Sequence, residues 1–319
     1  MDTPNLPALA PALPAETSPA QRLLAAWLSG RSPTTIRAYS SDAAAFAAWA
    51  GDPDAAAAAA RLLGAGHGAA NELALRWRSS MLDAGLSSAT VNRRLAALRS
   101  LVGLANVTGM IPWSLNVAGV KSEKRRDSRG PGTAGVRKLI MRAGQRGDAK
   151  GIRDVAILRL LYDRGLRRAE LCRLSLGDFD KEGRRISVQG KGKREKSWLP
   201  LYPKAIDALT AWMHVRPIKA GDNPEAPLFV NLDNAAPCAR LSVSGLYVTV
   251  RDLGKSAGMK LACHKIRHSA ITAFLDASKG DVREARKFAR HADIRTTVGY
   301  DDSDDQAAEA IAKKLSDNL

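Results

Sequence analysis

Residues 263–300 read CHKIRHSAITAFLDASKGDVREARKFARHADIRTTVGY and hold histidines, an arginine and a tyrosine at defined spacings. His264 and Arg267 stand three positions apart, which on a helix places both side chains on one face. His291 and Tyr300 follow, nine residues apart, at the end of the stretch. The chain has only 5 histidines, so the presence of His264 and His291 in this pattern is informative. We expect His264 and Arg267 to face one group together.

Two segments upstream supply further cations. Residues 163–171, DRGLRRAEL, place Arg167 at the expected start of a helix. Residues 185–200, RISVQGKGKREKSWLP, alternate on both sides of GKGK, which predicts a β-hairpin with Lys191 at its turn.

The balance of charge indicates a polyanionic partner. Lys and Arg number 49 against 32 Asp and Glu, which gives a formal net charge of +17. The excess is uneven, because +15 of it lies in residues 114–319. The length of 319 residues suits two domains, and no run approaches the roughly 18 apolar residues of a membrane span. Since the N-terminus has no signal-peptide pattern, we expect a cytoplasmic protein.

Metal and cofactor chemistry find no support in the sequence. Cys172, Cys238 and Cys263 are few, odd in number and scattered, without CxxC spacing. We therefore expect reduced thiols, no metal site and no cofactor.

The N-terminal part has the pattern of a small all-α domain. Residues 1–17 are rich in Pro and Ala without periodicity and predict a flexible tail. Over residues 18–113 apolar side chains recur at helical spacing, which predicts four helices joined by short links. A Gly-rich break is expected at 64–68, before a helix at 71–83.

The next segment, residues 114–135, is polar and basic and ends in Gly-Pro-Gly-Thr-Ala-Gly, which predicts an exposed interdomain linker. Its cations would suit phosphate contacts or would only solvate the linker, and both interpretations stay open for Lys121, Lys124, Arg125 and Arg126. Residues 136–319 form the second domain, with helices expected near 134–145 and 152–163 and again from Tyr202 onward.

Taken in order, these motifs resemble those of the tyrosine recombinase, or phage integrase, family. The family carries G-L-R-x-x-E-L, a hairpin lysine, H-x-x-R, G-H-x-x-x-x-T-T and a tyrosine nine residues past that histidine. In this chain the pattern falls on Arg167, Lys191, His264, Arg267, His291 and Tyr300. The match covers residues 154–301, and Ser32–Tyr39 and Ser88–Arg94 more weakly resemble the family's DNA-binding helices.

The resemblance implies a mainly α fold with a small β-sheet. An all-α SAM-like core-binding domain (18–113) would be followed by an α+β catalytic domain (136–319), and both would close around DNA. Double-stranded DNA with inverted-repeat core sites is the implied partner, bound by a homotetramer or a paired recombinase in the Xer-like or Cre-like manner, at the bacterial nucleoid. Besides the linker cations, the expected DNA contacts are Arg37, Arg93, Arg94, Lys193 and Arg290.

Physical chemistry gives these residue types a reason to meet at a phosphodiester. Charge grows on the non-bridging oxygens during attack, and the planar forks of Arg167 and Arg267 can bind those oxygens bidentately. Each preorganised donor contributes roughly 10²–10³ in rate, so acid–base groups are needed as well. We expect Tyr300 to attack phosphorus, with Lys191 protonating the departing 5′-oxygen. The resemblance implies a 3′-phosphotyrosyl link, which conserves bond energy for rejoining.

The imidazoles complete the expected site. His264 would assist proton transfer from the nucleophile, and His291 would hydrogen-bond a phosphoryl oxygen. Lys193 competes with Lys191 for the lysine role, and His268 could replace a neighbouring histidine. Arg290 stands where the family usually has glycine, and there it could bind DNA or reposition His291.

Several interpretations remain open from the sequence. Taken singly, each of these residues also fits an ordinary structural or surface position. Similar chemistry would serve a type IB topoisomerase-like nicking-closing enzyme, and a non-catalytic DNA-binding protein could keep the fold. Residues 301–319 are acidic with a thin apolar stripe, and they predict a last helix that docks on a neighbouring protomer or on its own domain. The interpretation that accounts for every motif is a site-specific DNA recombinase, acting in integration and excision or in dimer resolution.

Overall fold

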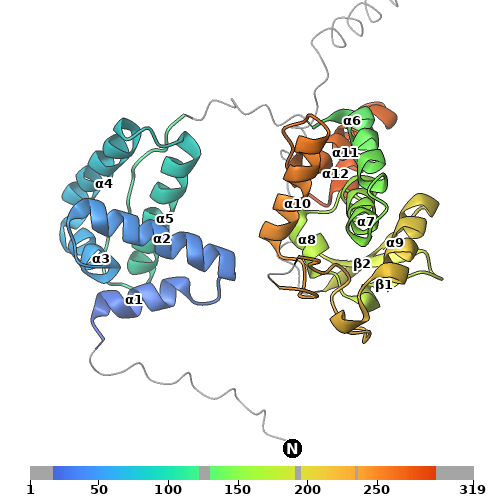
Figure 1. Ribbon diagram of the computed structural model, residues 1–319. Coiled ribbons are helices and arrows are strands. Elements are labelled where there is room, and N and C mark those ends of the chain that lie inside the picture. Colours follow the sequence, from blue (N-terminus) through green and yellow to red (C-terminus); the bar gives the residue numbers. More distant parts are fainter. Residues whose placement is uncertain (1–16, 122–129, 191–194, 234–235, 292–319) are drawn as a thin grey trace, which may run out of the picture. The chain divides into compact units, whose positions relative to one another are not determined.

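The computed structural model describes residues 17–121, 130–190, 195–233 and 236–291. It divides the chain into two compact units, Met1–Arg125 and Arg126–Leu319 (Figure 1). Several residues of functional interest lie outside the described ranges: Lys124, Arg125, Arg126, Lys191, Lys193 and Tyr300. The acidic segment 301–319, expected to form a last helix, lies outside them as well.

The first unit is helical throughout its regular structure (Figure 1). Its helices are α1 (Pro19–Leu28), α2 (Pro33–Ala50), α3 (Ala55–Gly64), α4 (Gly66–Asp83) and α5 (Ser88–Val107).

Local sequence explains where these helices begin and end. Ser18 and Gln21 form a reciprocal capping box at the start of α1, and Ser32 accepts from the Thr35 N–H before α2. The Asp54 carboxylate accepts two backbone N–H groups at the start of α3. Helix α2 ends at Gly51, whose φ of 73° lies in the left-handed region that glycine tolerates best.

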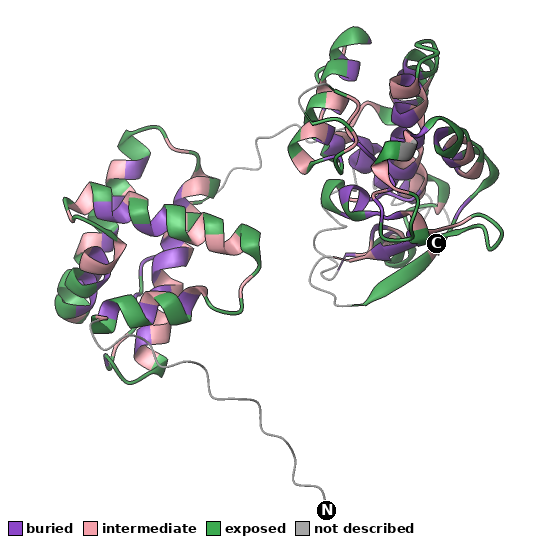
Figure 2. Cartoon of the chain, turned by 60° about the horizontal axis from the view of Figure 1, so that its bottom comes forward, coloured by how far each residue is buried: buried purple, intermediate pink, exposed green. Residues whose placement is uncertain are grey.

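An aromatic cluster forms the core of the first unit. Trp27, Phe46 and Trp77 are buried, and the Phe46 and Trp77 rings meet edge to face with centroids 5.0 Å apart. The buried residues line the inward faces of the helices in Figure 2.

Two details differ from the expected organisation of the first part. Residues 55–60, a run of alanines, begin helix α3, and the Gly-rich break reduces to Ala65. The described residues of the first unit therefore hold five helices rather than four. The first residues of the expected linker pack on this unit, because Leu115 and Val117 are buried in its core. The Asn92 side chain also exchanges hydrogen bonds of 2.9 and 2.7 Å with the Val120 backbone.

The second unit combines helices with a small sheet. Its helices are α6 (Gly132–Gly144), α7 (Ala149–Asp163), α8 (Arg168–Arg173), α9 (Pro203–Val215), α10 (Val243–Ser256), α11 (Cys263–Ala277) and α12 (Val282–Ala289), with 3-10 turns η1 (Leu176–Asp178) and η2 (Ile218–Ala220). Its strands are β1 (Phe179–Asp180), β2 (Arg185–Gln189) and β3 (Lys196–Pro200).

The strands pair antiparallel in the order β1-β2-β3. Strands β2 and β3 are the two arms of the predicted hairpin, and their register runs from Arg185 opposite Pro200 to Gln189 opposite Lys196. The short strand β1 was not predicted, because two residues carry no readable alternation. Expected and observed fold class agree: the chain is mainly α with a small sheet.

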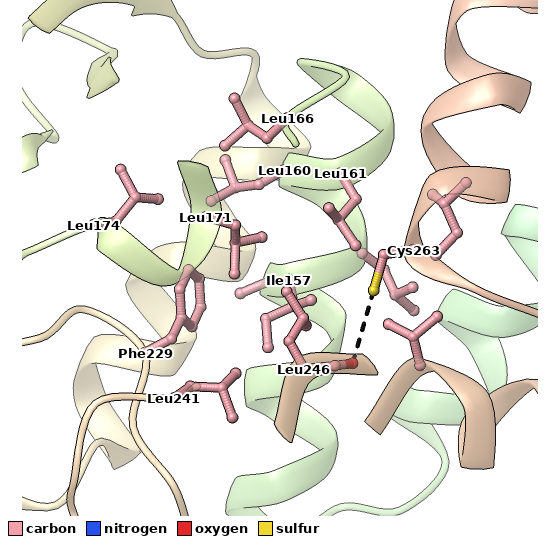
Figure 3. Close-up of a cluster of buried hydrophobic side chains, with 14 of the residues drawn as sticks. Ile157, Leu160, Leu161, Leu166, Leu171, Leu174, Phe229, Leu241, Leu246 and Cys263 are labelled. Atoms are coloured by element: carbon pink, nitrogen blue, oxygen red, sulfur yellow. Dashed lines mark hydrogen bonds between the residues drawn. The ribbon is translucent and has the colours of Figure 1, made fainter. Parts of the chain in front are cut away.

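Helix α7 lies at the centre of the second unit and packs against α6, α9 and α11. Its Ile157, Leu160 and Leu161 are fully buried among side chains from the surrounding elements, as Figure 3 shows. In the same view the Cys263 thiol at the start of α11 contacts the Leu246 carbonyl at 3.8 Å. This contact ties the start of α11 to α10.

A second apolar cluster joins α11 to α12. Ile271 and Leu275 of α11 are buried against Ala285 and Ala289 of α12. The Phe274 and Phe288 rings stack beside them, with centroids 4.6 Å apart. This cluster holds the end of α12 close to the face of α11 that carries the motif residues. Among the helices that the structure describes, none combines the length and apolar character needed to cross a membrane.

Candidate active site

Arg167 lies directly before helix α8, and Glu170 bonds both its backbone and its guanidinium. The Glu170 carboxylate accepts the Arg167 backbone N–H at 2.8 Å and the Arg167 Nη1 at 2.8 Å. Glu170 is buried, whereas the Arg167 side chain remains 28% exposed. Arg167 is thus the more accessible member of this ion pair.

Arg267 lies one turn into α11 and is buried. Its Nη1 donates to the Gly165 carbonyl and its Nη2 donates to the Ala289 carbonyl. These two contacts tie α11 to the turn before Arg167 and to the end of α12. Because a planar guanidinium with several partners has a fixed orientation, the fork is preorganised before any ligand arrives.

His291 follows α12 and is buried against Arg267. Helix α12 ends in a Schellman arrangement, in which the His291 N–H bonds the Arg286 carbonyl at 3.1 Å and Arg290 adopts the left-handed conformation. This arrangement brings His291 Nε2 to 3.0 Å from Arg267 Nη2. Arginine has no acceptor atom, so Nε2 must accept this bond and the ring proton of neutral His291 lies on Nδ1.

The electrostatics of the cluster favour a neutral His291. Burial lowers the pKa of His291 to about 4, and the nearby cations Arg267, Arg167 and Arg290 act in the same direction. A neutral imidazole with its proton on Nδ1 is a hydrogen-bond donor that does not add charge to the site.

His264 lies one turn before Arg267 on α11, at the exposed edge of the same cluster. Partial desolvation lowers its pKa, and Arg267 and Arg167 lower it further. Its position in the first turn of a 15-residue helix also disfavours the cationic form. His264 is therefore held in its neutral form, the form in which an imidazole can take up a proton.

A buried carboxylate balances the arginines. Burial alone would raise the pKa of Glu170, but attraction to Arg290 and the hydrogen bonds from Arg167 outweigh it and lower that pKa. Glu170 stays ionised as a result. The G-L-R-x-x-E-L spacing places Glu170 three residues after Arg167, but the sequence alone did not single it out as a member of the site.

The hairpin is anchored at its base. Lys196 Nζ of β3 donates to the Asp178 carboxylate at 2.6 Å, and Asp178 also accepts the Ser175 N–H at 2.9 Å. These bonds fix β3 to the turn that follows α8. The connection that bears Lys191 and Lys193 lies outside the described residues, as does Tyr300, so their roles stay predictions.

The structure thus brings together Arg167, Arg267 and His291, with His264 at the edge. The predicted DNA contacts of the first unit have mixed surroundings. Arg37 and Lys121 are exposed. Arg93 and Arg94 are charge partners of the buried carboxylate of Asp42 on α2, and the Arg94 side chain is 24% exposed.

Arg290, expected to contact DNA or to shift His291, has its side chain directed into the unit. Its guanidinium bonds Glu170 and three backbone carbonyls of the second unit. In the described residues, no group of three or more His, Cys, Asp or Glu side chains is placed to hold a metal ion.

Comparisons with known proteins identify relatives of this chain. The family model described as the phage integrase family matches residues 134–307. A tyrosine recombinase of Synechococcus elongatus is 40% identical over 89% of this chain and 91% of its own. A tyrosine recombinase of Synechocystis sp. is 37% identical over 91% of this chain and 92% of its own.

A solved structure shares the fold. The XerH site-specific recombinase, bound to a palindromic difH substrate in a post-cleavage complex, aligns with a TM-score of 0.61. The alignment covers 77% of this chain and 70% of that one, at 20% identity.

Proposed function

The chain belongs to the phage integrase family of tyrosine recombinases, and we propose that it cuts and rejoins DNA at specific sites through Tyr300. The observation that carries this proposal is the preorganised cluster of Arg167, Arg267 and neutral His291 inside the family match. Two guanidiniums and an imidazole N–H are the groups that a phosphodiester needs as it gains charge.

The proposed step is a phosphoryl transfer without a metal ion. The Tyr300 oxygen forms a bond to phosphorus while the bond from phosphorus to the 5′-oxygen breaks. Arg167, Arg267 and His291 stabilise the non-bridging oxygens, His264 accepts the phenol proton and Lys191 protonates the departing 5′-oxygen. The products are a 3′-phosphotyrosyl link and a free 5′-hydroxyl.

Rejoining reverses these events on a different strand. The incoming 5′-hydroxyl attacks the phosphotyrosyl phosphorus, and Tyr300 leaves as a phenol. The number of phosphoester bonds is unchanged, so the exchange needs no ATP. Water is the competitor that would waste the link, which makes a buried and preorganised site useful for recombination.

The proposed partner is double-stranded DNA that carries an inverted repeat. Exchange of both strands between two duplexes requires four cuts, and one tyrosine per protomer makes each cut, so we propose a tetramer on DNA. The XerH recombinase is bound to a palindromic substrate, which supports an inverted-repeat site for this chain. The net charge of +17 suits phosphate contacts and a steep loss of affinity with salt. The place of action would be the bacterial nucleoid in the cytoplasm, with the chain organised as a helical DNA-binding domain and a catalytic domain.

A two-site plasmid tests the proposal. DNA bound to the protein in its native cell is crosslinked and sequenced, and the recovered site is cloned twice into a supercoiled plasmid. We expect recombined circles with the native protein and none with Tyr300→Phe, which should still bind the site. Relaxation without recombined circles would indicate a nicking-closing enzyme, and binding without any cleavage would indicate a non-catalytic DNA-binding protein.

A further inference from the structure

Arg290 occupies a backbone position that its side chain does not favour. Its φ of 54° and ψ of 46° place it in the left-handed region at the end of α12. An L-residue with a Cβ is disfavoured there, and glycine is the usual occupant. The presence of arginine at this position calls for a contribution from its side chain.

The Arg290 guanidinium makes that contribution inside the active-site cluster. Its Nη2 lies 2.9 Å from the Glu170 carboxylate and 3.3 Å from the Gly165 carbonyl. Its Nη1 lies 3.0 Å from the Arg164 carbonyl and 3.3 Å from the Phe288 carbonyl. One side chain therefore connects the end of α12 to the turn that precedes Arg167 and to α8.

The Arg290 backbone adds a further connection. Its carbonyl oxygen accepts from Arg167 Nη2 at 3.1 Å. Arg167 and Arg290 thus each donate to Glu170, and Arg167 also donates to Arg290. The three residues form a closed set of contacts at the buried side of Arg167.

The charges of this set explain what it does for Arg167. Glu170 is buried, and a carboxylate paired with Arg167 alone would cancel the charge that a phosphate needs. The second guanidinium, on Arg290, supplies a second positive charge to the same carboxylate. The set of three then carries a net charge of +1, and Arg167 keeps its attraction for an anion.

We propose that Arg290 is a positioning residue, which fixes Glu170 and thereby orients Arg167 and preserves its charge for the scissile phosphate. The proposal rests on the proposed function, since it concerns the same reaction. The alternative role is a direct DNA contact. The Arg290 guanidinium bonds Glu170 and backbone carbonyls and its side chain is 17% exposed, and the measurements below distinguish the two roles.

Paired substitutions separate the side chain from the backbone. Arg290→Gly and Arg290→Ala both remove the guanidinium, but only glycine relieves the left-handed backbone. We expect the glycine variant to unfold at a higher temperature than the alanine variant. Both should form the covalent DNA adduct on the order of 10- to 100-fold more slowly than the native protein, because misplacement of a reacting group has effects of this size. A purely structural role would instead let the rate recover with the stability, and a glycine variant at the native rate would overturn the proposal.

Two further measurements separate positioning from DNA contact. At a protein concentration that saturates the DNA site, Arg290→Gly should still form the adduct slowly in a single turnover, because the defect lies in the position of Arg167. A weaker affinity with a native rate at saturation would identify a DNA contact and overturn the proposal. In a Glu170→Gln background, Arg290→Gly should slow cleavage little further, because the contact through which it acts is already weakened. A full additive loss there would contradict the mechanism.

Failure of this inference is distinguishable from failure of the proposed function. If the native protein forms no adduct, the proposed function fails. The contact between Arg290 and Glu170 is then tested by thermal unfolding of the two single variants and the double variant, without DNA. Non-additive changes in unfolding temperature would support the contact, and additive changes would contradict it.

Discussion

The Nη2 atom of Arg267 lies 3.0 Å from Nε2 of His291, and this contact determines the state of the imidazole. Arg267 can only donate, so His291 accepts through Nε2 and carries its proton on Nδ1. The same Nη2 bonds the Ala289 carbonyl, two residues before His291. Arg267 thus orients both the imidazole and the backbone that bears it.

The state of His291 predicts how stability changes with pH. Its pKa in the folded chain is about 4, below the value of about 6.5 in an unfolded chain. Between these values the unfolded chain binds the extra proton, so the contribution of His291 is complete above about pH 6.5 and is lost as pH falls toward 4. The full amplitude is roughly 3–4 kcal/mol, from about 1.4 kcal/mol for each of about 2.5 pKa units.

Urea denaturation from pH 7.5 to 4.5 measures this dependence. The native protein should lose more stability across the interval than His291→Gln, which has no imidazole to protonate. Equal losses in the two proteins would contradict a buried neutral His291.

Arg267→Lys should disable the site although it keeps the positive charge. The three donors of an ammonium share one nitrogen and do not reproduce the planar fork that reaches Gly165, Ala289 and His291, so buried acceptors lose their donors. We expect destabilisation of about 1–3 kcal/mol and adduct formation about 10²–10³-fold slower. The matched control is Arg283→Lys, an exposed position on α12, which should behave like the native protein in thermal unfolding and in single-turnover cleavage.

Glu170→Gln tests the carboxylate that serves two guanidiniums. We expect a loss of about 1–3 kcal/mol, because Arg167 and Arg290 lose a buried charged partner. Glu284→Gln is the control, since Glu284 pairs with Lys287 at the same helical spacing but at the surface, and it should cost under about 1 kcal/mol.

The pH dependence of these two variants adds a second check. The pKa of Glu170 is lowered, so its contribution is present above the unfolded pKa and disappears as pH falls through the folded one. The stability difference between the native protein and Glu170→Gln should therefore shrink in acid. A difference that is constant across this range would argue against an ionised Glu170.

At the start of the second unit, Gly130 lies so close to α11 that the structure has no room for a side chain there. A Cβ at Gly130 would collide with the Lys265 carbonyl and the Ser269 side chain of α11. Gly130→Ala should therefore lower the unfolding temperature and slow cleavage, since α11 carries Arg267. Gly103→Ala, inside α5 with no atom near its Cβ, should leave stability equal or raise it by about 0.5–1 kcal/mol. Native stability in Gly130→Ala would show that this close approach is dispensable.

The sequence predicted much of the fold because its signals are local. Apolar side chains at helical spacing over residues 18–113 predicted a helical first part, and alternation on both sides of GKGK predicted β2 and β3. The helix α3 was not recognised as a separate element, because a polyalanine run has no apolar stripe by which periodicity can be judged.

The site was predicted as a set of residues but not as a geometry. The order of the motifs identified Arg167, Arg267 and His291, which the structure brings together. The inward direction of Arg290 could not be read from sequence, because it depends on a left-handed backbone and on a carboxylate 120 positions earlier. For the same reason, the sequence did not predict that Glu170 contacts Arg290 as well as Arg167.

Covalent capture tests the central claim most directly. The protein is incubated with a nicked half-site, whose short cleaved strand diffuses away so that rejoining is prevented. The adduct is separated on a denaturing gel, digested and analysed by mass spectrometry. We predict a nucleotide remnant on the peptide that contains Tyr300, and no adduct from Tyr300→Phe. An adduct on a different residue, or an undiminished adduct in Tyr300→Phe, would contradict the account.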